Sequence, residues 1–330
     1  MTANAFPRVC IFGAGAIGGW IGVRLAAVGC DVSVVARGAT LAALQQHGLR
    51  LDMDGNPLEA RVRASEDPAA LGVQDLVVIA VKAPAMEDVA RRIAPLIGEH
   101  TVVLTAMNGV PWWFFQGFGG RYENRQLLAV DPKGDIGRAI PAKNIVGCVV
   151  HASCAMHGPG HVRHHFGNRL IIGEPSGGTS ARVSDVAALL ANAGFEADIS
   201  PQIQKDAWYK LWGNMTVNPV SAFTGATTDL IMADDLVRGF ISSVMLEARE
   251  IGARIGIPID QQPEDRHVIT RKLGAFKTSM LQDVEANKPV ELDALVTVVR
   301  EIGQMTDTPT PYTDALLGLA RLHARRHGLY

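Results

Sequence analysis

The sequence predicts an α/β domain built on a doubly wound parallel sheet, followed by an all-helical domain. Short apolar runs alternate with helical segments in the first part of the chain, which is typical of parallel strands covered by helices. From about residue 203 the strand signal disappears and helical periodicity continues to the end. We therefore expect domains of residues 1–200 and 201–330, because 330 residues suffice for two hydrophobic cores.

The elements of the first domain follow in chain order. We expect strands at 9–12, 32–36, 76–81, 101–105, 145–152, 162–172 and 194–199, and helices at 16–28, 86–97 and 181–193. Alternating residues on either side of Asp54-Gly55 predict a hairpin. In the helical domain, prolines predict breaks near Pro219, Pro258, Pro289 and Pro309.

Composition excludes several classes of function. A formal net charge of −2 provides no basic field, so we expect no nucleic-acid partner. The apolar stretch 9–29 contains six glycines and Arg24 and continues into a strand, so we read it as part of a folded unit. No other run is long enough to cross a bilayer, and we expect a cytoplasmic protein with no membrane partner.

The four cysteines form no CxxC pair, which favours thiols in a reducing compartment.

A glycine loop follows the first expected strand and opens the first helix. Its residues are Gly13, Ala14, Gly15, Ala16, Ile17 and Gly18. In this context Gly13 permits a tight turn, Gly15 lets the backbone approach a pyrophosphate, and Gly18 lets the helix pack on the strand. The helix N-terminus then favours the phosphates. The loop therefore predicts a Rossmann-type dinucleotide-binding domain.

Residues at the ends of later strands narrow the choice of cofactor. The second strand is followed by Arg37, where NAD enzymes usually carry an acidic residue that binds the ribose 2′-hydroxyl. A guanidinium pairs with a 2′-phosphate, so we expect NADP (NADPH). Lys82 and Asn108 follow two further strands and are candidates for lining the cofactor site. The alternative for each is an ordinary loop residue.

Lys210, Asn214 and Asn218 are spaced i, i+4, i+8, which places them on one face of a helix. An ammonium and two amides in line suit a small polar substrate, and a charged lysine is able to protonate a developing alkoxide. The alternative is a solvated face, although asparagine has little reason to lie in the middle of an exposed helix. Ser279 and Glu291 form a second polar pair, and Glu291 near a helix start is also explained by the helix dipole.

These motifs together resemble the ketopantoate reductase (2-dehydropantoate 2-reductase) family over nearly the whole chain. The most specific segments are Lys210-Leu-Trp-Gly-Asn214 with Asn218-Pro219, and 278–283 followed by Glu291-Leu-Asp293. The resemblance implies reduction of ketopantoate to pantoate by NADPH, in pantothenate and coenzyme A biosynthesis. It implies that Lys210 is the proton donor and that Asn214, Asn218 and Ser279 bind substrate.

The resemblance also implies roles for three further residues. Glu291 would lie near the nicotinamide and the substrate hydroxyl and keep Lys210 protonated. Asn108 would contact cofactor and substrate, and Ser153 would contact the cofactor where the family commonly has alanine. Two departures from the family pattern bear on the substrate. Ala85 stands where glutamine is common, and the aromatic run 112–115 follows Asn108-Gly109. This run would either alter the shape of the substrate site or form a subunit contact.

Two other functions stay open at this stage. One is a related β-hydroxyacid dehydrogenase that uses NADP and acts on another small 2-oxoacid. The other is a non-catalytic NADP-sensing protein. The oligomeric state is also open, with a homodimer among the options. We expect no metal, because the histidines of the 151–165 region have no carboxylate at ligand spacing and hydride transfer needs none; these are His151, His157, His161, His164 and His165.

Overall fold

The computed structural model describes residues 5–330, which form two compact units. The sheet unit comprises the chain up to Met107 together with Trp113–Arg125 and Lys133–Ile203. The helical unit comprises Asn108–Trp112, Gln126–Pro132 and Gln204–Tyr330. Two short segments after the seventh strand therefore pack with the helical unit, although they lie far from it in sequence. Within residues 5–330, no helix has both the length and the apolar character that crossing a membrane requires.

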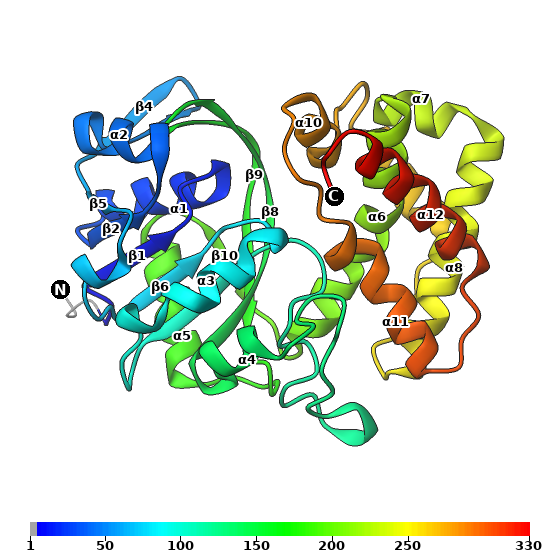
Figure 1. Ribbon diagram of the computed structural model, residues 1–330, viewed down its shortest axis with the longest axis horizontal. Coiled ribbons are helices and arrows are strands. Elements are labelled where there is room, and N and C mark those ends of the chain that lie inside the picture. Colours follow the sequence, from blue (N-terminus) through cyan, green and yellow to red (C-terminus); the bar gives the residue numbers. More distant parts are fainter. Residues whose placement is uncertain (1–4) are drawn as a thin grey trace. The chain divides into compact units, whose positions relative to one another are not determined.

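The sheet unit contains one ten-stranded mixed sheet (Figure 1). The strands are β1 (Arg8–Phe12), β2 (Asp31–Val35), β3 (Leu49–Met53), β4 (Asn56–Ala60), β5 (Arg63–Ser65), β6 (Leu76–Ile79), β7 (Val102–Ala106), β8 (Ile145–Gly158), β9 (His161–Gly173) and β10 (Glu196–Ile199). The main path of the sheet runs β4-β3-β9-β8-β7-β6-β1-β2-β5, and β10 pairs with β9. The part from β8 to β5 is parallel, which confirms the predicted fold class.

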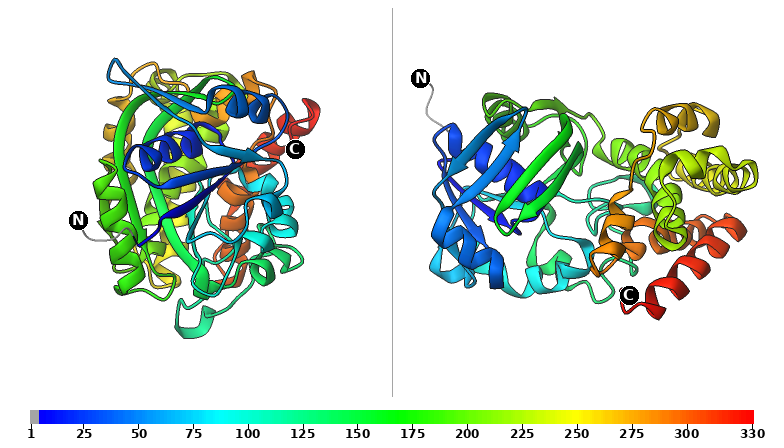
Figure 2. Two further views of the ribbon diagram at one scale, coloured as in Figure 1. Left: turned by 90° about the vertical axis from the view of Figure 1, so that its left-hand side faces the viewer. Right: turned by 90° about the horizontal axis from the view of Figure 1, so that it is seen from above.

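Two antiparallel pairs extend this parallel sheet. The expected hairpin at Asp54-Gly55 joins β3 to β4, and both turn residues have positive φ, as a type I′ turn requires. The hairpin of β8 and β9 is longer than predicted and curves beside the first helix (Figure 2). Since β3 pairs in parallel with β9, the two hairpins form one continuous surface.

The helices of the sheet unit are α1 (Ala16–Ala27), α2 (Gly38–His47), α3 (Met86–Arg92), α4 (Asp135–Ala139) and α5 (Ala181–Asn192). Short 3₁₀ turns lie between them: η1 (Pro68–Ala70), η2 (Ala83–Ala85), η3 (Ala94–Leu96), η4 (Gly120–Tyr122) and η5 (Ala142–Asn144). Helix α1 is buried along most of its length, from Gly18 to Leu25. A helix surrounded by protein needs no polar face, which explains why its sequence is so apolar.

The helical unit confirms the predicted loss of strands after residue 203. It contains α6 (Ile203–Thr224), α7 (Thr228–Ala233), α8 (Asp235–Arg254), α9 (Pro263–Arg271), α10 (Ser279–Glu285), the π-helical turn η6 (Asp293–Thr297), α11 (Val298–Met305) and α12 (Pro311–Arg326). The predicted break near Pro219 is wrong, because Pro219 lies inside α6. A proline inside a helix costs about 3 kcal/mol. Burial of the apolar side chains of α6, among them Trp208, Trp212 and Met215, offsets that cost.

The aromatic run after Gly109 belongs to the core. Trp112, Trp113, Phe114 and Phe115 are all buried, and the indole of Trp113 donates a hydrogen bond to the Thr105 hydroxyl at 3.1 Å. These side chains therefore present no exposed surface to a subunit partner.

Candidate functional site

The glycine loop joins β1 to α1 in the sheet unit. Gly13 has a φ of +97°, a conformation that glycine adopts without strain. A Cβ added at Gly18 would lie 2.0 Å from the carbonyl oxygen of Gly13 and 3.1 Å from Cβ of Ala80, on the segment after β6. The third glycine is therefore required by close packing of α1 against the sheet, as the sequence predicts.

The tip of the loop fits the pyrophosphate of a dinucleotide. A Cβ added at Gly15 would meet no atom within 4 Å, so the backbone is open to a ligand at this position. Gly15 is also the N-cap of α1, where the helix dipole and the backbone N–H groups favour an anion. Of the other predicted loop residues, Ala14 precedes this N-cap, and Ala16 and Ile17 form the first turn of α1.

Three more predicted cofactor residues lie in the sheet unit. Arg37 lies two residues after the end of β2, is exposed, and is the N-cap residue of α2. Lys82 follows the β6 segment and is the N-cap of η2, with a partly buried side chain. Both residues thus lie at the carboxyl ends of parallel strands, where open α/β sheets bind ligands. Ser153 lies within β8, between two register shifts in its pairing with β9.

In the helical unit, Lys210 of α6 and Asn108 lie in direct contact. The Lys210 ammonium donates a hydrogen bond of 2.8 Å to Oδ1 of Asn108. Both side chains are partly buried, so this interaction is stronger than the same pair would be in water. One of the three ammonium N–H groups is used in this way, and the amide oxygen fixes the direction of the lysine side chain.

Asn214 and Asn218 lie on the same continuous helix as Lys210. The i, i+4, i+8 spacing therefore does place the three polar side chains along one face. Asn214 is partly buried and Asn218 is buried. Two indoles attach α6 to α8, with Nε1 of Trp212 donating to the Met245 carbonyl at 2.7 Å and Nε1 of Trp208 donating to the Ala248 carbonyl at 3.3 Å. The polar row is thus carried by a rigid helix.

The segment after β7 is held against the π-helical turn η6. The Val110 amide donates to the carbonyl of Ala294 at 2.9 Å. Gly109 has a φ of +81°, and a Cβ there would lie only 2.4 Å from the same carbonyl oxygen. Gly109 therefore permits a close approach that places Asn108 beside Lys210. The position of Asn108 after a strand is a sequence signal, whereas the role of Ala294 has none, because η6 has no recognisable sequence pattern.

Ser279 and Glu291 lie on two further elements of the helical unit. Ser279 is the first residue of α10, exposed, and follows Thr278, whose hydroxyl caps the helix. Glu291 is 8% exposed and comes just before η6, where its backbone carbonyl accepts a hydrogen bond from Leu295. The structure thus places a buried glutamate two residues before the turn whose Ala294 carbonyl accepts a hydrogen bond from Val110.

Comparison with known proteins decides the family. The family model "Ketopantoate reductase PanE/ApbA" matches residues 9–177, and "Ketopantoate reductase PanE/ApbA C terminal" matches residues 202–324. The chain belongs to the ketopantoate reductase family. A 2-dehydropantoate 2-reductase of Mesorhizobium japonicum is 45% identical over 324 residues, which cover 98% of this chain and 99% of the relative.

Solved structures of ketopantoate reductases share the whole fold. The crystal structure of a candidate ketopantoate reductase from Ralstonia solanacearum MolK2 is 58% identical, with a TM-score of 0.95 over 98% of this chain and 99% of that one. A ketopantoate reductase of the PanE/ApbA family from Ralstonia eutropha is 27% identical, with a TM-score of 0.81 over 97% of this chain and 99% of that one. Both similarities span the sheet unit and the helical unit.

Proposed function

We propose that this member of the ketopantoate reductase family reduces 2-dehydropantoate to pantoate with NADPH. The observation that carries the proposal is the hydrogen bond between Lys210 and Asn108, which holds an ammonium on the polar face of α6. The relative from Mesorhizobium japonicum, described as a 2-dehydropantoate 2-reductase, supports the choice of substrate.

The sheet unit holds the cofactor in this proposal. The loop from Gly13 to Gly18 binds the pyrophosphate, and Arg37 pairs with the 2′-phosphate. Lys82 and Ser153 line the rest of the cofactor site. When bound, NADPH supplies a hydride to the carbonyl carbon of the substrate. No metal is needed for this step, since protein donors stabilise the developing oxyanion.

Lys210 supplies the proton. As the carbonyl oxygen gains electrons, an N–H of the Lys210 ammonium donates its proton to that oxygen, which leaves a neutral amine and the alcohol product. Asn108 orients the ammonium during this step. Solvent then restores the lysine proton.

The remaining polar residues bind the substrate in this proposal. Asn214, Asn218 and Ser279 donate hydrogen bonds to its carboxylate and hydroxyl groups. Glu291 accepts from the substrate hydroxyl, and its negative charge favours the ammonium form of Lys210.

The decisive measurement is ketopantoate-dependent oxidation of NADPH by the purified protein, compared with NADH and with a panel of other 2-oxoacids. We expect turnover of ketopantoate with a preference for NADPH. Turnover of another oxoacid without ketopantoate would establish a related dehydrogenase instead. Tight NADPH binding without turnover of any acid would establish a sensing protein.

The assembly and location of the protein also stay predictions. A homodimer is the state we propose to test, by light scattering of the purified chain during gel filtration. Cell fractionation tests the expected cytoplasmic location.

A further inference from the structure

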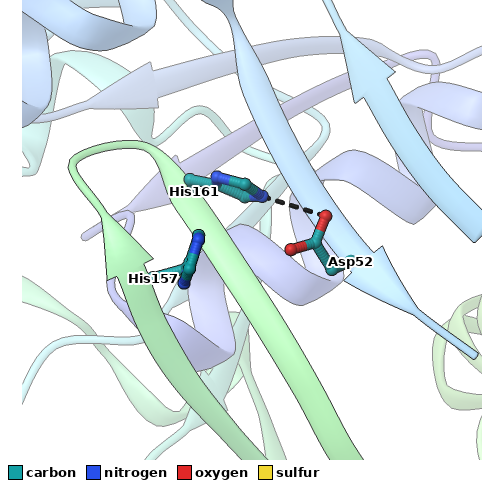
Figure 3. A group of neighbouring side chains, drawn as sticks. All are labelled: Asp52, His157 and His161. Carbon is teal, nitrogen blue, oxygen red and sulfur yellow. Dashed lines mark ion pairs between the residues drawn. The ribbon is translucent and has the colours of Figure 1, made fainter. Parts of the chain in front are cut away.

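Two histidines and an aspartate meet at the end of the β8–β9 hairpin, in the sheet unit. They are Asp52 of β3, His157 of β8 and His161 of β9 (Figure 3). Across the part of the chain that the structure describes, this is the one group of three or more His, Cys, Asp or Glu residues whose ligand atoms all lie within 4.8 Å of one another. None of the three residues takes part in the reductase site proposed above.

Strand pairing brings Asp52 and His161 to the same face of the sheet. In the parallel pair of β3 and β9, Arg50 is opposite His161 and Asp52 is opposite Arg163. Leu51 and Val162, which alternate with these residues, are buried on the other face beside α1. Because side chains alternate along a strand, Asp52 and His161 point away from the core. Nε2 of His161 lies 3.1 Å from Oδ1 of Asp52.

A β-bulge brings His157 into the group. Met156 pairs with Val162 and Gly158 pairs with His161, so His157 is the extra residue of β8 in this irregular register. Bulges redirect a side chain that regular pairing would place elsewhere. The rings of His157 and His161 lie edge to face, with centroids 4.9 Å apart. The His157 side chain is exposed and the other two are partly buried, so solvent reaches the group.

The backbone around the group is fixed. The Arg50 amide donates to the carbonyl of Gly160 at 3.0 Å, which ties the hairpin turn to β3. A guanidinium nitrogen of Arg163 lies 3.4 Å from Oδ2 of Asp52, the carboxylate oxygen other than the one paired with His161. Second contacts of this kind hold a carboxylate ligand in place in metal sites.

We propose that Asp52, His157 and His161 bind a divalent transition-metal ion of the Zn²⁺ type, with water as the fourth ligand. Two imidazoles and one carboxylate with an open position are a usual donor set for such an ion. Tetrahedral zinc places its ligand atoms about 3.3 Å apart. The His161–Asp52 pair has a spacing of 3.1 Å, close to this value, and a ring nitrogen of His157 lies within 4.8 Å of the ligand atoms of both residues. The ion links β3 to the tip of the β8–β9 hairpin.

The sequence-based expectation of no metal depended on a missing carboxylate. No acidic residue near the histidines in sequence has ligand spacing, but Asp52 precedes His161 by more than a hundred positions and is brought there by the pairing of β3 with β9. Only tertiary structure reveals the third ligand.

The test is equilibrium dialysis of the tag-free full-length protein against ZnCl₂, with thermal unfolding measured in parallel. We expect one tightly bound Zn²⁺ per chain and a raised unfolding temperature. His157→Ala and His161→Gln should each weaken Zn²⁺ binding at least tenfold and remove the thermal shift. His165→Ala is the matched control, because His165 is also exposed on β9 but lies outside the group.

Each outcome bears on the proposal. Unfolding temperatures of the metal-free variants that match the parent protein show that the variants fold, and loss of Zn²⁺ binding in them then supports the site. No saturable binding at one ion per chain overturns the proposal. Binding that survives in either histidine variant, or that is lost equally in His165→Ala, also overturns it.

Discussion

Nζ of Lys210 and Oδ1 of Asn108 lie 2.8 Å apart, although 102 positions separate the two residues in the chain. The contact exists because the segment Asn108–Trp112 packs with the helical unit instead of with the sheet that precedes it. The proposed proton donor is thereby oriented by a residue that lies two positions after the end of β7.

Replacement of Lys210 tests its role as proton donor. We expect Lys210→Ala to lower kcat with ketopantoate about a hundredfold or more, because positioned general acids contribute by that amount. NADPH affinity, measured by fluorescence titration, should change little. Lys205→Ala is the control, since Lys205 is an exposed lysine of the same helix. A Lys210→Ala enzyme with the parent rate contradicts the assignment.

Arg37 tests the choice of cofactor. We expect Arg37→Ala to raise KM for NADPH roughly tenfold to a hundredfold, because a hydrogen-bonded pair with a charged phosphate is lost. The KM for NADH should stay unchanged, since NADH has no 2′-phosphate. Arg125→Ala, another exposed arginine of the sheet unit, provides the control. Equal effects on both cofactors argue against a 2′-phosphate contact.

Gly109 tests the close approach to η6. Gly109→Ala places a Cβ 2.4 Å from the Ala294 carbonyl oxygen, so the segment that carries Asn108 must move. We expect a lower kcat and a loss of about 1–3 kcal/mol in the free energy of unfolding. Gly119→Ala is a matched control, because Gly119 has a φ of +82° but a Cβ there meets no atom within 4 Å. The control has the same backbone strain without the clash, and kcat should be normal. An equal loss of kcat in both variants would contradict the role of Gly109 in positioning Asn108.

Glu174 tests the pH dependence of stability. Burial raises the pKa of its carboxyl group, but hydrogen bonds from Arg182, at 2.7 Å, and from Ser180 outweigh burial and leave the pKa below its usual 4.5. Between the folded-state pKa and pH 4.5, the unfolded chain therefore binds more protons than the folded chain. The interaction of Glu174 with Arg182 and Ser180 thus stabilises the fold fully above pH 4.5, and this stabilisation is lost as the pH falls through the folded-state pKa.

We therefore expect Glu174→Gln to lower the free energy of unfolding by about 1–3 kcal/mol at neutral pH. The difference from the parent protein should shrink in acid. Glu264→Gln removes an exposed pair with Arg271 and should cost less than about 1 kcal/mol. Urea unfolding at several pH values measures both effects, and a difference that grows in acid would be inconsistent with a lowered pKa.

Much of the fold was predictable because local patterns and global structure agree. The alternation of apolar strands with helices, the glycine loop and the Asp54-Gly55 turn all have direct sequence signals, and the structure places each as expected. The failure at Pro219 has a physical reason. Proline discourages a helix locally, but the burial of neighbouring large side chains outweighs that preference, and only tertiary packing sets their burial.

The sequence by itself determined three features: the glycine loop, the absence of an acidic residue after β2, and the alignment of Lys210, Asn214 and Asn218 on one helix. Each of them depends only on residue spacing within one element or its adjoining loop. Tertiary structure decided which distant residues meet. The packing of Asn108 with the helical unit places it against Lys210, the π-helical turn receives Val110 beside Gly109, and β3 brings Asp52 to two histidines. Such contacts depend on how elements pair and pack, which no local pattern records.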